Sequence, residues 1–210
     1  IEHLFAQLQS SSVELYAYPT HTLEDDLTAR IKPYFSSWKQ LTNKNDKEAA
    51  DLIHSDGIHI LIDLSGHTSR NRLPVFALKP APIQVSYLGY WATTGVKEMD
   101  YIIGDSFVMP DNQASHFTEK IWQLPESFLC LTEPLTPIDI APLPALKNNF
   151  ITFGCFNNVA KMTDGVIELR AKVLKAVPNS KLFLKSKQLI EDARRKNIIE
   201  RFAKNGITQD

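Results

Sequence analysis

The sequence contains no apolar run near the roughly 18 residues that a membrane-spanning helix needs, so we expect no membrane segment. Its only two cysteines, Cys130 and Cys155, lack C-x-x-C spacing, which argues against a disulfide framework or a structural zinc site and fits a reducing, cytoplasmic compartment. We recognise no signal peptide. No dense block of Lys and Arg is present, and the net charge is −1. Broad electrostatic binding to nucleic acid or an anionic membrane is therefore not expected, and any recognition of phosphate must be local.

With 43% hydrophobic and 22% charged residues, the chain of 210 residues has a globular composition. Strand and helix patterns alternate along it, which predicts an α/β fold with a parallel sheet and right-handed crossovers. The run from Ile58 to Leu64 is almost unbroken in its hydrophobicity, which is typical of a parallel strand covered by helices on both faces. Helices are predicted at 25–34 and 46–55, and further strands at 13–18, 38–41, 83–87, 101–104, 150–155 and 181–184. Another helix is predicted after Thr163, and its core-facing side is expected to hold five apolar residues, Val166, Leu169, Val173, Leu174 and Val177.

Composition divides the chain into three parts. Residues 132–149 hold four prolines and few regular signals, so we expect an extended linker there. It would join an α/β domain at 1–131 to the opening of a second one at 150–210. Because the chain begins inside an expected helix, we expect a piece of a longer protein whose first domain is incomplete at its N-terminus.

Two segments of the first domain could hold a ligand, because ligands of open α/β sheets lie beyond the carboxyl ends of the strands. After the strand at 83–87 comes a loop from Leu88 to Gly95, which is rich in glycine and threonine. The alternative is a tight connection that needs glycine only for its backbone angles. The segment Asp63–Thr68 follows the most apolar strand, and its His67 could exchange a proton near neutral pH. Here the alternative is a capped turn with an ordinary loop histidine.

In the second domain, the segment 154–163 joins the end of a strand to the start of a helix. Free backbone N–H groups at a helix start favour an anion, and Lys161 adds a positive charge beside Asn157 and Asn158. The segment suits a phosphate or diphosphate, although it has neither the Walker pattern nor G-x-G-x-x-G. A helix cap with a surface lysine is the alternative. Asp100 and Asp105 could form a glycosidase-like carboxylate pair, but strand-end aspartates more often form turns.

Taken in order, these segments resemble glycosyltransferase family 41, the O-linked N-acetylglucosamine transferases and the SPINDLY proteins. The resemblance rests on seven stretches that run over nearly all of the chain: 63–68, 79–85, 88–90, 93–95, 99–101, 154–163 and 176–180. The residues in these stretches are nearer to those of the bacterial and SPINDLY-type members than to those of the animal enzyme. No single stretch is decisive, but the ordered set is highly specific.

The resemblance implies a GT-B fold, in which two Rossmann-like domains hold a nucleotide-sugar donor between them. It also implies transfer of the sugar to Ser or Thr hydroxyls of proteins, with no metal and no cofactor besides the donor. Lys161 matches the lysine that contacts the donor diphosphate, and Asn158 matches a neighbouring position. Leu88 and Gly89 match the loop at the donor sugar. His67 is a second catalytic candidate, although the animal enzyme has Tyr there, which argues against an indispensable base.

The family pattern is broken at Trp91 and Ala92, where a small, turn-forming pair is usual, so the sugar pocket could differ. The first expectation is N-acetylglucosamine transfer from UDP-N-acetylglucosamine. The alternative within the family is fucose transfer from GDP-fucose, and an alternative of another class is a module that binds a nucleotide sugar or a protein without turnover. Many relatives carry tetratricopeptide (TPR) repeats before this region. We expect the isolated 210 residues to be inactive.

Overall fold

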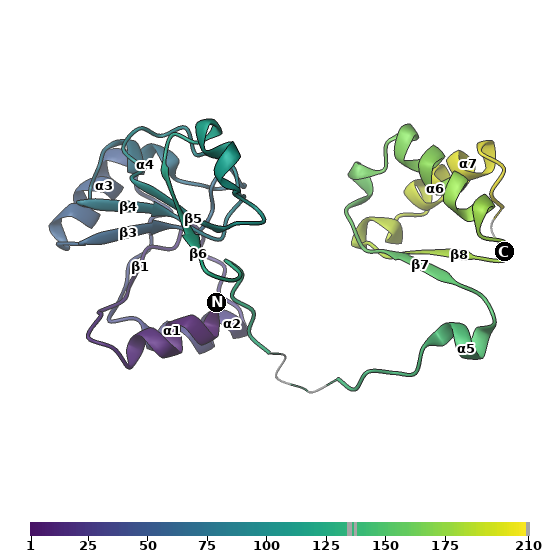
Figure 1. Ribbon diagram of the computed structural model, residues 1–210. Coiled ribbons are helices and arrows are strands. Elements are labelled where there is room, and N and C mark those ends of the chain that lie inside the picture. Colours follow the sequence, from purple (N-terminus) through teal and green to yellow (C-terminus); the bar gives the residue numbers. More distant parts are fainter. Residues whose placement is uncertain (134–135, 137, 209–210) are drawn as a thin grey trace. The chain divides into compact units, whose positions relative to one another are not determined.

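A computed structural model describes residues 1–133, 136 and 138–208. Residues 134, 135 and 137 of the expected linker lie outside the described part, as do residues 209 and 210. The chain forms two compact units, Ile1–Leu135 and Thr136–Asp210 (Figure 1). Each is an α/β unit with parallel strands, as the alternation of patterns predicts.

In the first unit, a parallel sheet has the strand order β3-β4-β5-β6. Its strands are β3 (Ile60–Asp63), β4 (Ile83–Ser86), β5 (Tyr101–Asp105) and β6 (Lys120–Leu124). Two short strands, β1 (Tyr16–Ala17) and β2 (Ser37–Trp38), pair in parallel with each other. The sequence predicted all of these strands except β6, although β1 and β2 are shorter than expected.

The helices of this unit are α1 (Glu2–Gln9), α2 (Asp26–Ile31), η1 (Lys32–Tyr34), α3 (Asp46–Ser55), α4 (Leu73–Ala77) and η2 (Asp111–His116). Helix α3 has the predicted bounds. It begins there because Asn45 and Glu48 form a capping box, in which each side chain accepts a hydrogen bond of 2.9 Å from the other residue's backbone N–H.

The core of the first unit lies between the β3–β6 sheet and the helices α3 and α4, which are on one side of β3 and β4 (Figure 1). Ile53 of α3, Leu61 of β3 and Phe76 of α4 are all buried in this cluster. On the opposite face of β3, Ile60 is 54% and Ile62 is 48% exposed. The prediction that Ile58–Leu64 is covered on both faces is therefore wrong for the described residues, because only one side of the strand packs against helices.

The second unit contains β7 (Thr152–Cys155) and β8 (Lys181–Leu184), which pair in parallel. Its helices are α5 (Pro144–Asn148), η3 (Val159–Lys161), α6 (Asp164–Ala176), η4 (Lys187–Ile190) and α7 (Asp192–Lys204). Helix α5 is one short turn within the segment 132–149, where the sequence predicted no helix. None of the helices among the described residues is both long and apolar enough to cross a membrane.

Helix α6 begins as predicted, because the Thr163 side chain accepts a hydrogen bond from the Val166 backbone N–H. Its predicted apolar side is correct only in part, because Val166, Leu174 and Val177 are half-buried but Leu169 and Val173 are exposed. Ile167 is buried beside Phe202 of α7, whereas Leu169 is 64% exposed. Both residues are apolar and lie two positions apart, so the sequence alone did not identify which one faces the core.

Candidate functional site

The turn that follows β3 is organised by the buried carboxylate of Asp63. Its oxygens accept hydrogen bonds from the backbone N–H groups of Ser65 (3.0 Å) and Gly66 (2.8 Å). Burial raises the pKa of Asp63, and these two hydrogen bonds oppose that rise. Gly66 has a φ of +52°, which a glycine adopts without strain. Asp63 thus caps the turn, which is the structural role considered for it from the sequence.

The turn at 63–68 and the loop at 88–95 lie backbone to backbone. A Cβ atom on Gly89 would lie 2.8 Å from the carbonyl carbon of Ser65 and 2.9 Å from the backbone N of Gly66. Only a glycine permits this approach. The preceding residue, Leu88, has a φ of +66°, a left-handed conformation that is costly for a branched side chain. The two predicted ligand-side segments are therefore parts of one surface at the carboxyl ends of β3 and β4.

His67 joins the same two segments. Its Nε2 lies 3.0 Å from the carbonyl oxygen of Thr93. Because a carbonyl only accepts hydrogen bonds, this contact places a proton on Nε2. In this arrangement Nε2 is occupied with the loop, and only Nδ1 is left to accept a proton. Two residues before Thr93, Trp91 is 51% exposed, and its ring stacks on that of Tyr90 with a centroid distance of 5.2 Å.

A residue that the sequence did not indicate, Glu119, holds the far half of this loop. It lies just before β6, is 4% exposed, and accepts hydrogen bonds from the Thr94 backbone N–H (2.6 Å), the Thr94 hydroxyl and the Thr93 hydroxyl (2.8 Å). Burial opposes the charged form, but the hydrogen bonds from Thr94 and Thr93 outweigh it and keep the pKa of Glu119 below its ordinary value.

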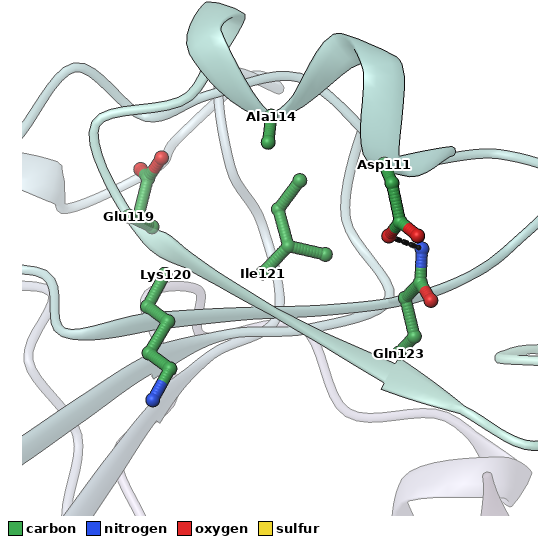
Figure 2. A pocket seen from close by; sticks show the side chains of 6 residues that line it. All are labelled: Asp111, Ala114, Glu119, Lys120, Ile121 and Gln123. Carbon is green, nitrogen blue, oxygen red and sulfur yellow. Dashed lines mark hydrogen bonds between the residues drawn. The ribbon is translucent and has the colours of Figure 1, made fainter.

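A pocket lies beside Glu119, between β6 and η2. Figure 2 shows Glu119, Ile121 and Gln123 on one side of β6 and Lys120 on the other. Gln123 donates a hydrogen bond of 3.0 Å to Asp111 of η2, which closes one end of the pocket. The pocket adjoins the 88–95 loop through Glu119, but it contains none of the residues predicted from the sequence.

In the second unit, Asn158 and Lys161 lie on the connection between β7 and α6, as predicted. The Asn158 side chain caps η3 by accepting a hydrogen bond of 2.9 Å from the Ala160 backbone N–H. Lys161 is the last residue of η3 and is exposed. Among the described residues, its ammonium group has no carboxylate partner. It is therefore available to an anion from outside the chain.

Cys155 ends β7 close to this connection and borders a second pocket. The guanidinium of Arg170 lies 3.1 Å from its sulfur. A hydrogen bond from the Asn157 backbone lowers the pKa of the Cys155 thiol, with a smaller contribution from Arg170. Both cysteines are free.

The aspartates at the ends of β5 do not form a catalytic pair. Asp100 makes an ion pair of 2.5 Å with Lys79 and accepts a hydrogen bond from the Gln84 backbone N–H. Asp105 is buried and accepts hydrogen bonds from three backbone N–H groups, one of them that of Phe128. Both are structural, as the more frequent role of strand-end aspartates suggested. Within the described part of the chain, no three His, Cys, Asp or Glu side chains gather as metal ligands would.

Comparisons with known proteins cover both units. The chain is 37% identical over 211 residues to a protein of Oryza sativa named "Probable UDP-N-acetylglucosamine--peptide N-acetylglucosaminyltransferase SPINDLY", covering 99% of this chain and 23% of the relative. The Arabidopsis thaliana protein of the same name is 39% identical over 81% of this chain and 19% of its own length. A Caenorhabditis elegans UDP-N-acetylglucosamine--peptide N-acetylglucosaminyltransferase is 51% identical over 39% of the chain and 7% of its own length. The chain thus spans less than a quarter of these relatives.

A solved structure of a mutant Thermobaculum terrenum O-GlcNAc transferase matches with a TM-score of 0.87 and 30% identity, over 99% of this chain and 40% of that one. The Rossmann-like parallel sheets are those of the GT-B type of fold that the resemblance implies. The family model described as "Glycosyl transferase family 41" matches residues 6–132, which is more than half of the chain. The chain belongs to glycosyltransferase family 41.

Proposed function

We propose that these residues form part of a protein O-glycosyltransferase that transfers N-acetylglucosamine from UDP-N-acetylglucosamine to Ser or Thr hydroxyls of proteins. The observation that carries this proposal is the similarity along 99% of the chain to a relative that is named a probable UDP-N-acetylglucosamine--peptide N-acetylglucosaminyltransferase. Residues 1–131 would form the acceptor-side domain, residues 132–149 the linker, and residues 150–210 the opening of the donor-binding domain.

In such a transfer, the bond between the sugar's anomeric carbon and the diphosphate breaks, and a bond to the acceptor oxygen forms. The acceptor hydroxyl loses its proton, so the products are the glycosylated protein, UDP and one proton. Negative charge develops on the departing diphosphate. The exposed ammonium of Lys161 is suited to stabilise that charge, and an effect that grows in the transition state accelerates the reaction. Asn158 lies at the start of the same 3-10 turn, where it orders the backbone that would face the diphosphate.

On the first unit, Leu88 and Gly89 would contact the donor sugar. The close approach of Gly89 to the Ser65–Gly66 backbone supports this, because it fixes the first half of the loop. The Nε2 contact of His67 with Thr93 supports a role in holding the loop and leaves only Nδ1 for proton transfer. Exposed Trp91 lies in the same loop as Leu88 and Gly89, so it is the residue most suited to alter the choice of sugar.

The experiment that tests the proposal measures sugar transfer by the full-length protein from UDP-N-acetylglucosamine and, separately, from GDP-fucose. Mass spectrometry of an acceptor protein reads out the added sugar. We expect N-acetylglucosamine transfer, and we expect Lys161→Ala to lose most of it. Lys196→Ala is the matched control, because Lys196 is an exposed lysine on α7.

Each outcome of that experiment has one meaning. Transfer of fucose alone would mean that the donor is GDP-fucose and that the protein is still a glycosyltransferase. Binding of a nucleotide sugar in calorimetry without turnover would support a non-catalytic binding module instead. If neither sugar is transferred and Lys161→Ala changes nothing, the transferase proposal is wrong. We also propose that the 210 residues alone transfer no sugar, because the donor-binding domain would be incomplete.

A further inference from the structure

We infer that Glu119 is a positioning residue that holds the 88–95 loop in the shape that receives the donor sugar. This inference rests on the proposed function and adds to it a residue that lies outside the stretches carrying the family resemblance. The side chain of Glu119 is anchored just before β6, and within the described part of the chain its three hydrogen-bond donors belong to Thr93 and Thr94 of the loop.

The first argument is the cost of burying a charge. A carboxylate that is 4% exposed has lost most of its water, which strongly disfavours the charged form unless hydrogen bonds or a cation replace that water. Among the described residues, Glu119 has no lysine or arginine partner, so the two threonines carry that compensation. The fold therefore keeps Glu119 charged only while the loop stays in place. Loss of the loop conformation would leave the carboxylate buried and unsatisfied.

The second argument is the way in which the loop is held from two sides. At one end, Gly89 lies against the Ser65–Gly66 backbone. At the other end, Thr93 is bound through its carbonyl by His67 and through its hydroxyl by Glu119. The Thr93 hydroxyl also accepts the backbone N–H of Gly95 at 3.2 Å. A loop fixed at both ends presents its middle in one shape, which lowers the ordering cost of binding a sugar.

The test distinguishes an effect on binding of the sugar from an effect on binding of the nucleotide. Because the loop would contact only the sugar, loss of Glu119 should weaken binding of UDP-N-acetylglucosamine and leave binding of UDP unchanged. Calorimetry on the full-length protein measures both dissociation constants for the wild type and for Glu119→Ala. We expect the dissociation constant of UDP-N-acetylglucosamine, divided by that of UDP, to rise about tenfold or more, since three hydrogen bonds to a charged acceptor are lost. Glu126→Ala, a change at an exposed glutamate near the end of β6, should leave the ratio unchanged.

A milder pair of variants covers the case in which Glu119→Ala does not fold. Thr93→Val removes the hydroxyl that reaches Glu119 and should raise the ratio, whereas Thr93→Ser keeps the hydroxyl and should restore the wild-type ratio. Equal weakening of UDP and UDP-N-acetylglucosamine, or no change in either, would overturn the role of Glu119 while the transferase proposal stands. A wild-type protein that binds neither UDP-N-acetylglucosamine nor GDP-fucose would overturn the proposed function and this inference with it. If GDP-fucose is the donor, GDP takes the place of UDP.

Discussion

Replacing Gly89 by alanine tests whether the β3 turn and the β4 loop touch as the structure has them. The added Cβ would lie 2.8, 2.9 and 3.0 Å from three backbone atoms of Ser65 and Gly66, all closer than the 3.4 Å at which ordinary contact begins. No flexible side chain can yield there, so the two segments must separate by several tenths of an ångström. Overpacking of this kind costs about 1 to 3 kcal/mol, and because all three atoms belong to rigid backbone we expect Gly89→Ala to cost about 2 to 3 kcal/mol.

Urea unfolding of the 210-residue chain measures this loss. All three tryptophans, Trp38, Trp91 and Trp122, belong to the first unit, so their fluorescence follows that unit alone. The midpoint should fall while the slope stays constant, because the surface exposed on unfolding is unchanged.

Gly57→Ala is the control in the same unit. Gly57 has a φ of +67° but no atom within 4 Å of an added Cβ, so only backbone strain of about 1 kcal/mol applies. If Gly89→Ala destabilises the unit no more than Gly57→Ala does, the close approach of the two segments is wrong.

Three further predictions concern the core, the pH dependence and the thiols. Phe76→Ala should destabilise the first unit by about 3 to 5 kcal/mol, whereas Phe107→Ala, at an 88% exposed position, should change it little; urea unfolding measures both, and equal losses would contradict the core assignment. Because the pKa of Glu119 is lowered in the folded chain, its contribution to stability is complete above pH 4.5 and is lost as the pH falls further. The melting temperature of Glu119→Gln should therefore fall less steeply than that of the wild type as the pH is lowered. Parallel curves of melting temperature against pH would refute this. Iodoacetamide should modify Cys155 faster than Cys130 at neutral pH, as peptide mass spectrometry would show, since its thiol has the lowered pKa; equal rates would contradict it.

The sequence predicted elements whose signals are local. Helix α3 has the predicted bounds because Asn45 and Glu48 define its start within four residues. Strand β6 was missed although it is as long as β5, because its sequence, Lys-Ile-Trp-Gln-Leu, contains no continuous apolar run. The covering of Ile60 and Ile62 was predicted wrongly, since an apolar run shows that a strand can be buried but not which elements lie against it.

In the candidate site too, the sequence located residues with local signals but not those whose contacts depend on distant residues. Lys161 and Asn158 could be located because a strand end followed by a helix cap is readable from neighbouring residues. Glu119 could not, because the threonines that bind it lie about 25 residues earlier and meet it only through the parallel order of β4, β5 and β6. The contact of His67 with Thr93 depends in the same way on tertiary structure, across 26 residues.

The most direct test of the account is the rate of sugar transfer by the full-length protein with and without the ammonium of Lys161. Turnover of UDP-N-acetylglucosamine onto an acceptor protein is measured for the wild type, Lys161→Ala and the control Lys196→Ala. Loss of one preorganised stabilising group typically lowers kcat about 100- to 1,000-fold, and we predict a loss of this size for Lys161→Ala and none for Lys196→Ala. Equal transfer rates for Lys161→Ala and the wild type would contradict the account.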